Sequence, residues 1–355
     1  MEGVIIVINP GSTSTRMALF RGKERIAEET VRHDSAELAP FDNVADQFDL
    51  RMAKIDQWLA SAGIDSHKVA ALAGRGAPLR PLQDSIYAIN EKMLDDLRTA
   101  RYSNHASNLG ALIADHLRKR FNVPAVIVEP ITTDNLTDFA RISGIPEIVR
   151  KSRSHALNIK EVCRREAENI GKDYTRANFV VAHMGGGISV AAVKGGLIVD
   201  VNDGLLGMGP FSPERAGALP IGGVVEMCFS GKYTREEIIN KFSRESGFKA
   251  YLGTADLRAV EKMIDAGDEK AELYFGAMVY QIAKEIGACA AVLKGGIDGI
   301  IFTGGMAHSA RLVKQLSEYV STFGKVTVVA GEYEMEALAA GALRVLEGIE
   351  IPKEY

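Results

Sequence analysis

The chain has 355 residues, of which 46% are hydrophobic and 25% are charged, and its formal net charge at pH 7 is -4. This length exceeds one ordinary hydrophobic core, so we expect two domains with a cleft between them. The composition excludes extensive disorder, and the acidic balance argues against nucleic acid as a partner, although a locally basic cleft is compatible with small anions.

The amino-terminal segment is not typical of a signal peptide, because Glu2 stands where basic residues are required and the apolar stretch ends at Asn9. No later apolar run approaches the ~18 residues that a membrane span needs. The cysteines lack the spacing of a zinc site or a disulfide framework, so we expect core thiols: Cys163, Cys228 and Cys289. We therefore expect a cytoplasmic protein with no membrane partner.

Two segments share one pattern of strand, turn, strand, turn and strand, which is most simply interpreted as a duplicated fold. The first covers residues 4–31 and carries the turn Asn9-Pro10-Gly11-Ser12-Thr13-Ser14-Thr15. The second covers residues 178–201 and carries His183 followed by Gly185, Gly186 and Gly187. Glycines allow close backbone approach, and consecutive turn amides form an anion site. Two such turns facing each other are predicted to bind a polyphosphate.

Between the copies, the hydrophobic pattern predicts helices over residues 44–62, 91–100 and 107–121 and strands over residues 69–73 and 125–128. The two strands deliver Arg75 and Glu129 to neighbouring strand ends, where α/β sheets collect ligands. The later pattern predicts helices over residues 155–169, 269–293 and 334–346 and strands over residues 299–303 and 326–329. We predict domains at residues 1–150, joined by a carboxy-terminal helix within residues 334–355, and at residues 151–333.

Two arginines are candidates for binding anions. Arg75 lies between two glycines after a strand, and Arg215 lies in a loop too long to be a mere connection. A surface salt bridge for Arg75 and a pairing of Arg215 with Glu214 are the alternatives. His105, His155 and His183 are candidates too, with satisfied structural histidines as the alternative.

The common catalytic and nucleotide-binding motifs are missing from the sequence. It has no His/Cys metal spacing and no Gly-x-Ser-x-Gly motif. It also has no Gly-x-x-x-x-Gly-Lys-Ser/Thr loop and no Gly-x-Gly-x-x-Gly motif opening a helix. A phosphate site in this chain therefore belongs to another design.

Several motifs resemble a known family across nearly the whole chain. The segments that start at Asn9, at His183 and at Phe302, the last including Gly304 and Gly305, resemble the two phosphate motifs and the adenosine motif of the acetate and butyrate kinases. Three further stretches, residues 140–146, 212–217 and 336–343, resemble the butyrate kinases in particular. The resemblance implies two duplicated ribonuclease-H-like (actin-like ATPase) α/β domains with a nucleotide cleft between them.

The resemblance also implies roles for individual residues, with ATP or ADP and Mg as cofactors. Asn9, Ser12 and Ser14 match the first phosphate turn, and Gly185, Gly186 and Gly187 match the second. Arg75 and Arg215 match phosphate-clamping arginines, and His155 and His183 match histidines beside the γ-phosphate. His105 matches a substrate-side histidine. Glu129 and Glu336 match metal-side acids, with Glu334 as the alternative to Glu336.

The expected reaction is reversible phosphoryl transfer from ATP to butyrate, giving butanoyl phosphate and ADP. A carboxylic acid with a pKa of about 4 to 5 is ionised at neutral pH and attacks phosphorus without a general base. Ala77 and Ser154 stand where acetate kinases place larger residues, which implies room for an alkyl tail. The alternatives are a kinase of isobutyrate, valerate, propionate or acetate, and a non-enzymatic actin-like or chaperone-like nucleotide-binding protein. We expect a homodimer or a higher homo-oligomer.

Overall fold

The structure is a computed structural model that describes residues 3–64 and 68–355. The chain forms two compact units: the first comprises the chain up to Asp134 together with Tyr333–Tyr355, and the second comprises Asn135–Glu332. The sequence placed the division after Arg150, but residues 135–150 belong to the second unit. The Arg150 guanidinium pairs with Asp200 of strand β9 (Leu197–Val201) at 2.7 Å, and the Thr137 N–H donates to Val199.

The first unit is built on a mixed sheet with the strand order β3-β2-β1-β4-β6-β5. Its strands are β1 (Val4–Pro10), β2 (Ser14–Arg21), β3 (Glu24–Arg32), β4 (Val69–Arg75), β5 (Ile86–Ala88) and β6 (Ala125–Val128). Its helices are α1 (Ser35–Leu38), η1 (Val44–Gln47), α2 (Phe48–Ser61), α3 (Glu91–Arg98), α4 (Asn108–Phe121) and α13 (Glu334–Leu346). The first three strands are antiparallel, and β4 and β6 run parallel to β1.

The second unit has a sheet ordered β11-β10-β7-β8-β9. Its strands are β7 (Asn178–Met184), β8 (Ile188–Lys194), β9, β10 (Gly299–Gly304) and β11 (Val326–Ala330). Its helices before the long α11 are α5 (Asp138–Arg141), α6 (Ala156–Asn169), η3 (Tyr174–Arg176), α7 (Ile221–Phe229), α8 (Arg235–Arg244), α9 (Gly247–Leu252) and α10 (Leu257–Asp265). The remaining helices are α11 (Glu269–Val292), η4 (Gly305–His308) and α12 (Ala310–Val320).

The two sheets share one topology, which confirms the predicted duplication. In each, an antiparallel three-strand meander comes first, and two strands parallel to its first strand follow on the other side. The predicted strands over residues 69–73, 125–128, 299–303 and 326–329 all form. The short strand β5 is a finding that the hydrophobic pattern did not predict.

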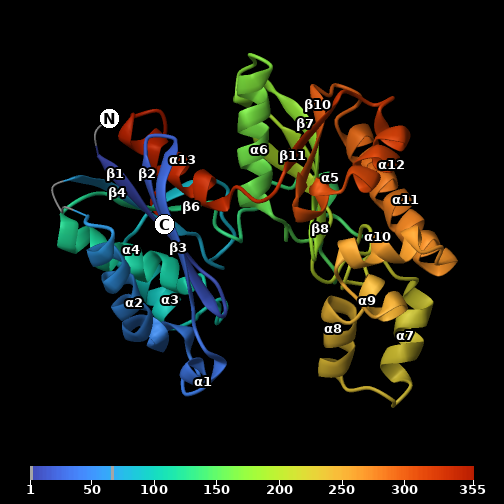
Figure 1. Cartoon of the computed structure of the whole chain (residues 1–355), viewed down its shortest axis with the longest axis horizontal. Helices are drawn as coiled ribbons and strands as arrows, with labels where there is room; N and C mark the ends of the chain where they lie inside the picture. Colours follow the sequence, from blue (N-terminus) through green and yellow to red (C-terminus); the bar gives the residue numbers. More distant parts are fainter. Residues whose placement is uncertain (1–2, 65–67) are drawn as a thin grey trace. The chain divides into compact units, whose positions relative to one another are not determined.

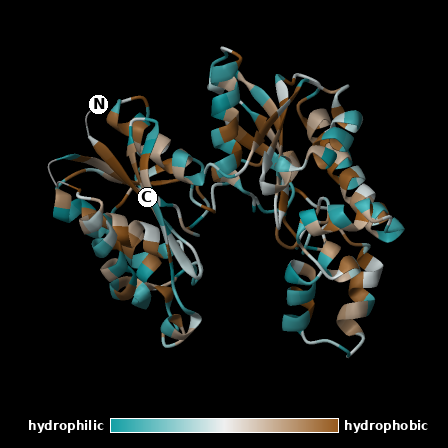
Figure 2. Ribbon diagram, viewed as in Figure 1, coloured by the Kyte–Doolittle hydropathy of each residue, from teal (hydrophilic) through white to brown (hydrophobic). Residues whose placement is uncertain are grey.

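Each sheet is covered by helices on both faces (Figure 1). In the first unit, Ile6 and Ile8 of β1 join the core cluster formed with α2, α3 and α4, and the alternate residues Ile5 and Val7 are equally buried. Strands buried on both faces read as continuous apolar runs, as β1 does. Hydrophobic residues accordingly concentrate in the central strands of both sheets (Figure 2).

Close packing of helices onto β4 and β6 depends on glycines. A Cβ added at Gly74 would lie 2.6 Å from the carbonyl oxygen of Gly110 on α4, and one added at Gly341 of α13 would lie 2.6 Å from a methyl group of Val128. Both distances are too short for real Cβ contacts. The glycines therefore let α4 and α13 approach the strands whose ends carry Arg75 and Glu129.

Helix α7 is apolar and has no buried residue. Phe229 is 86% exposed, and Cys228 is exposed too, whereas Cys163 and Cys289 are buried as predicted. The expectation of a core thiol was therefore wrong for Cys228. Among the described residues, no helix is both long and apolar enough to cross a membrane.

Candidate active site

In the first unit, three polar side chains lie at or just after the ends of three parallel strands. Asn9 lies near the end of β1, Arg75 ends β4, and Glu129 follows β6. Strand β4 pairs in parallel with both neighbours, and Arg75 is opposite Val128 in the register. The three strand ends therefore lie side by side, as the sequence predicted for Arg75 and Glu129. Such an edge is where α/β sheets hold ligands.

Glu334, the first residue of α13, joins this group. Arg75 Nη1 donates to Glu334 Oε2 at 3.1 Å and to Asn9 Oδ1 at 3.2 Å, and Asn9 Nδ2 donates to the same Glu334 oxygen at 2.9 Å. Glu336, which the sequence preferred, instead lies 3.5 Å from Arg25 of β3. Two residues turn a helix by ~200°, so the two carboxylates point in different directions. The structure thus brings the alternative, Glu334, to the strand ends.

Glu129 is buried in a strained backbone conformation. Its φ is 45°, its exposed fraction is 6%, and its N–H donates to the Ser85 carbonyl at 2.6 Å. A non-glycine residue in this region costs of order 1–3 kcal/mol, and such strain is concentrated at functional sites. A Cβ added at Gly76 would overlap Pro130, so the segments after β4 and β6 are in close contact.

A buried arginine holds the polar turn between β1 and β2. Arg51 of α2 has an exposed fraction of 0% and donates to the carbonyl oxygens of Gly11 at 2.9 Å, Ser12 at 3.0 Å and Ser14 at 3.0 Å. It also donates to Thr15 Oγ1 at 3.1 Å. Ser12, at the tip of the turn, is exposed. The guanidinium therefore fixes the shape of the predicted phosphate turn through its carbonyl groups.

Neutral groups complete the surroundings of Arg51. Its Nη2 also donates to Gln47 Oε1 at 2.8 Å, and burial lowers the pKa of the guanidinium to about 10, so it stays charged at neutral pH. His33 Nε2 lies 2.9 Å from Thr15 Oγ1. Burial, and then the charge of Arg51, lower the pKa of His33 to about 4, so this imidazole is neutral.

His105 and Ala77 also belong to the first unit. The Ser107 N–H donates to His105 Nδ1 at 3.2 Å, so the proton of the neutral ring is on Nε2. Burial lowers the pKa of His105, and the nearby charge of Arg75 lowers it further. Ala77 has an exposed fraction of 1% and packs in the core of the unit.

In the second unit, the three glycines form the turn between β7 and β8, and the Gly185 N–H donates to the Gly187 carbonyl at 3.0 Å. A Cβ added at Gly187 would overlap the guanidinium of Arg215. The Gly186 carbonyl accepts a hydrogen bond from the Ser212 hydroxyl. Glycine is therefore required for Arg215 to lie against this turn, and the structure brings these predicted residues together.

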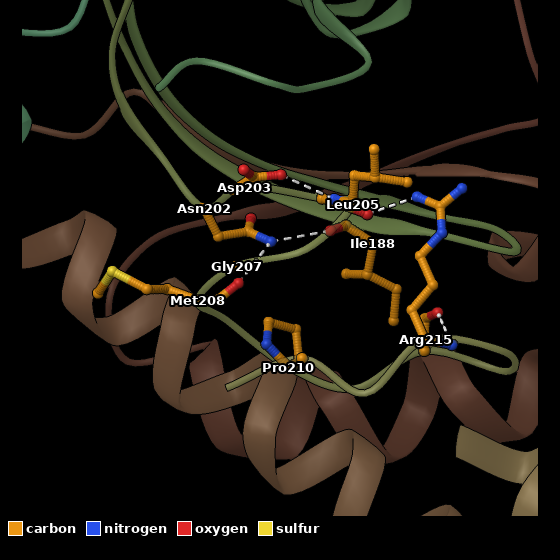
Figure 3. Close-up of a pocket in the computed structure, with 11 residues that line it drawn as sticks. Ile188, Asn202, Asp203, Leu205, Gly207, Met208, Pro210 and Arg215 are labelled. Atoms are coloured by element: carbon orange, nitrogen blue, oxygen red, sulfur yellow. Dashed lines mark hydrogen bonds between the residues drawn. The ribbon is translucent and has the colours of Figure 1, made fainter. Parts of the chain in front are cut away.

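The Arg215 guanidinium donates to the Gly204 carbonyl and lines a small pocket, with a volume of about 10 Å³, that also includes Asn202 (Figure 3). This volume fits about one water molecule. Within the described ranges, Arg215 Nε is buried without a hydrogen-bond partner. Burial lowers the pKa of Arg215, while the charges of Glu214 and Asp203 oppose this shift.

His155 and His183 stack on each other, with ring centroids 3.9 Å apart and an interplanar angle of 12°. His155 Nδ1 lies 2.9 Å from Ser189 Oγ, and His183 Nδ1 lies 2.9 Å from Asn158 Nδ2. Burial, with His155 as a second cause, holds the pKa of His183 well below its usual range. The two predicted histidines therefore form one paired unit.

The end of β10 touches the start of the glycine turn. Gly304 has a φ of 86°, and a Cβ there would overlap the carbonyl oxygen of Met184. Gly305 begins η4, and space is open around its Cβ position. Ser154, predicted to line the acyl pocket, is half-buried, and in the described part of the chain its hydroxyl oxygen has no hydrogen-bond partner.

Sequence reasoning missed three buried polar residues that hold predicted site residues in place: Arg51, Asn158 and Thr303. Arg51 carried a usable signal, because a charged residue stood on the apolar face of an amphipathic helix between Phe48 and Ile55. Thr303 lies inside the motif that starts at Phe302, but neither Thr303 nor Asn158 carried a signal of its own, since single polar residues at such positions are ordinary.

Comparison with known proteins gives a family model, described as the Acetokinase family, that matches residues 145–330, a little over half of the chain. The chain belongs to the acetokinase family. Solved structures similar to this chain include acetate kinase from Porphyromonas gingivalis, with 20% sequence identity and a TM-score of 0.77, covering 97% of this chain and 100% of that one.

Two further solved structures show the same fold, a duplicated actin-like ATPase (ribonuclease-H-like) α/β fold. Propionate kinase from Francisella tularensis has 18% identity and a TM-score of 0.76, and acetate kinase from Entamoeba histolytica has 17% and 0.76; each comparison covers 96% of this chain and 98% of the other. The acetokinase family match spans His155, His183, Arg215 and Gly304. Asn9, Arg75, Glu129 and Glu334 lie outside the matched range.

Proposed function

We propose that this member of the acetokinase family is a butyrate kinase that transfers the γ-phosphoryl group of ATP reversibly to butyrate, giving butanoyl phosphate and ADP. One observation carries the proposal: the Arg215 guanidinium lies against Gly187, and the stacked His155 and His183 rings lie beside the same glycine turn. A cation and hydrogen-bonding imidazoles at a backbone anion site suit the charge that develops in phosphoryl transfer.

The proposed chemistry needs charge compensation more than proton transfer. Butyrate is ionised at neutral pH, and one of its oxygens attacks the γ-phosphorus while the bond to the β-phosphate oxygen breaks and ADP leaves. Arg215, His155 and His183 of the second unit and Arg75 of the first unit are proposed to act on the transferring group. The turn from Gly11 to Ser14 and the glycine turn are proposed to bind nucleotide phosphates.

Mg fits the acidic residues at the strand ends of the first unit. Mg is commonly held by one or two carboxylates, water and substrate phosphates. Across the residues that the structure describes, no cluster of three or more His, Cys, Asp or Glu side chains could hold a metal by itself. We propose that Glu334 and Glu129 orient the ion, which when bound would neutralise phosphate charge.

The preference for butyrate rests on small residues at the predicted acyl positions, Ala77 and Ser154. Two extra buried methylenes contribute about 1.6 kcal/mol, which is only about a fifteenfold preference over acetate. Neighbouring acids such as isobutyrate, valerate and propionate should therefore react as well. A homo-oligomeric state and a cytoplasmic location remain predictions.

The test is a panel of carboxylates with ATP and Mg, with the acyl phosphate trapped as its hydroxamate and the products ranked by kcat/KM. We expect butyrate at or near the top and acetate about fifteenfold lower. A highest kcat/KM with acetate or propionate would support a carboxylate kinase but reject the preference for butyrate. ATP hydrolysis without any hydroxamate would instead support an actin-like or chaperone-like nucleotide-binding protein.

A further inference from the structure

A chain of buried hydrogen bonds ends on the imidazole of His183. Asn158 Nδ2 lies 2.9 Å from His183 Nδ1 and 3.0 Å from Thr303 Oγ1, and the Thr303 hydroxyl donates to the Gly331 carbonyl at 3.2 Å. The exposed fractions are 1% for Asn158, 0% for Thr303 and 2% for His183. These hydrogen bonds join residues of α6, β7 and β10 to Gly331, the residue after β11.

The Gly331 carbonyl fixes the direction of these hydrogen bonds, because a carbonyl oxygen can only accept. The Gly331 carbonyl has no hydrogen, so the Thr303 hydroxyl gives its one hydrogen to it. Thr303 Oγ1 must then accept from Asn158, which requires the NH₂ group of the amide to face it. That nitrogen is a donor only, so its second hydrogen goes to His183 Nδ1. The neutral ring of His183 therefore carries its proton on Nε2.

The protonated nitrogen lies on the side of the glycine turn. A Cβ added at Gly185 would lie 3.8 Å from His183 Nε2. Within the described ranges, Nε2 has no hydrogen-bond partner from the protein. Burial and the neighbouring His155 hold the pKa of His183 well below its usual range, so the ring stays neutral at physiological pH. His183 thus offers one N–H at the turn.

We propose that Asn158 and Thr303 are positioning residues that hold His183 in the Nε2–H tautomer, so that it donates a hydrogen bond to an anionic oxygen at the glycine turn. This role rests on the proposed function, in which the oxygen belongs to the transferring phosphoryl group. The opposite tautomer would present a lone pair to that oxygen and repel it. A donor held in place before the reaction stabilises developing charge without reorganising.

The tautomer is measurable in the wild-type protein by long-range ¹H–¹⁵N NMR after labelling histidine with ¹⁵N. His183→Gln assigns the signals among the seven histidines. We expect Nδ1 to show the shift of an unprotonated nitrogen and Nε2 that of a protonated one at pH 7. An Nδ1–H tautomer, an imidazolium or an equal mixture of the two tautomers would overturn the proposal.

Variants then connect the tautomer to turnover. Asn158→Leu and Thr303→Val remove the constraint, so we expect mixed tautomers and a loss of kcat on the order of a hundredfold, with KM for ATP changed much less. Thr303→Ser keeps the hydroxyl and, unlike Thr303→Val, should show the wild-type tautomer and kcat. Asn178→Ala, at the other end of β7, is the matched control and should leave both unchanged. Unchanged kcat in variants that have lost the tautomer would overturn the proposal.

The two hypotheses fail in different ways. If an active carboxylate kinase shows His183 as the Nδ1–H tautomer, the positioning role is wrong and the proposed function stands. If the Nε2–H tautomer is found in a protein that phosphorylates no carboxylate, the proposed function is wrong and the constraint by Asn158 stands.

Discussion

Arg75 and Glu334 are 259 positions apart in the sequence, yet Arg75 Nη1 donates to Glu334 Oε2 at 3.1 Å. The bond connects the end of β4 to the first residue of α13. Asn9 bonds to both side chains, so the strand ends of the first unit and the last helix share one polar cluster.

Glu334→Gln should reduce activity far more than Glu336→Gln. Glu334 lies against Arg75 and Asn9, whereas Glu336 lies near Arg25. We expect Glu334→Gln to lower kcat at least tenfold and to raise the Mg concentration needed for half-maximal rate, because a neutral amide is a weaker ligand. Steady-state rates over an Mg titration measure both. A larger loss in Glu336→Gln would reject the assignment of Glu334.

Arg75→Ala and Arg215→Ala should each lower kcat by on the order of a hundredfold or more, while nucleotide affinity falls much less. A cation that binds developing charge acts mainly in the transition state. Turnover and calorimetric binding of a non-hydrolysable nucleotide separate the two effects. Near-normal turnover in both variants would leave these arginines with structural roles only.

Arg51→Met should destabilise the first unit by about 3 kcal/mol and weaken nucleotide binding. The substitution leaves several buried oxygens of the turn without their charged donor, and each such loss carries a desolvation penalty. Denaturant unfolding and calorimetry are the measurements. Arg118→Met on α4, whose guanidinium pairs with Asp115 at a more exposed site, is the matched control and should cost less than about 1 kcal/mol. Equal losses of unfolding free energy in the two variants would contradict the role of Arg51 in holding the turn between β1 and β2.

His33 should make the protein less stable in mild acid. Its pKa is lowered from 6.5 to about 4 in the folded chain, so the unfolded chain takes up a proton first as the pH falls. The stability contribution is present above pH 6.5 and is lost between pH 6.5 and about 4. His33→Gln should flatten this part of the pH dependence of the unfolding free energy. An unchanged slope in that variant would show that other groups cause the loss.

Ala77→Val combined with Ser154→Phe should shift the preference towards acetate by about 1 to 3 kcal/mol in relative kcat/KM, because the added atoms fill the proposed alkyl pocket. The acetate-to-butyrate ratio of kcat/KM is the measurement, and circular dichroism checks folding. A fixed ratio in a folded variant would place the acyl pocket elsewhere.

The sequence predicted most of the fold because its signals were local. Apolar runs such as the one in β1 are long and are followed by turn residues, and the repeated meander made the duplication visible. Placing Arg75 and Glu129 at adjacent strand ends required only the rule for parallel sheets.

The remaining features depend on contacts between distant segments. Nothing local distinguishes Glu334 from Glu336, since the direction of each carboxylate follows from how α13 packs on the sheet. The hydrogen-bond chain through Asn158 and Thr303 links residues 145 positions apart. Likewise, residues 135–150 pack with the second unit because Arg150 meets Asp200, a contact that no local pattern encodes.

The central claim, that a carboxylate of this substrate class attacks the γ-phosphorus, is tested most directly by ³¹P NMR of the reaction with ATP, Mg and butyrate labelled with ¹⁸O in both carboxylate oxygens. We predict butanoyl phosphate whose phosphorus signal carries the isotope shift of one bridging ¹⁸O, formed together with ADP. Consumption of ATP that yields only inorganic phosphate, or no consumption of ATP, would contradict the assignment of this protein as a butyrate kinase.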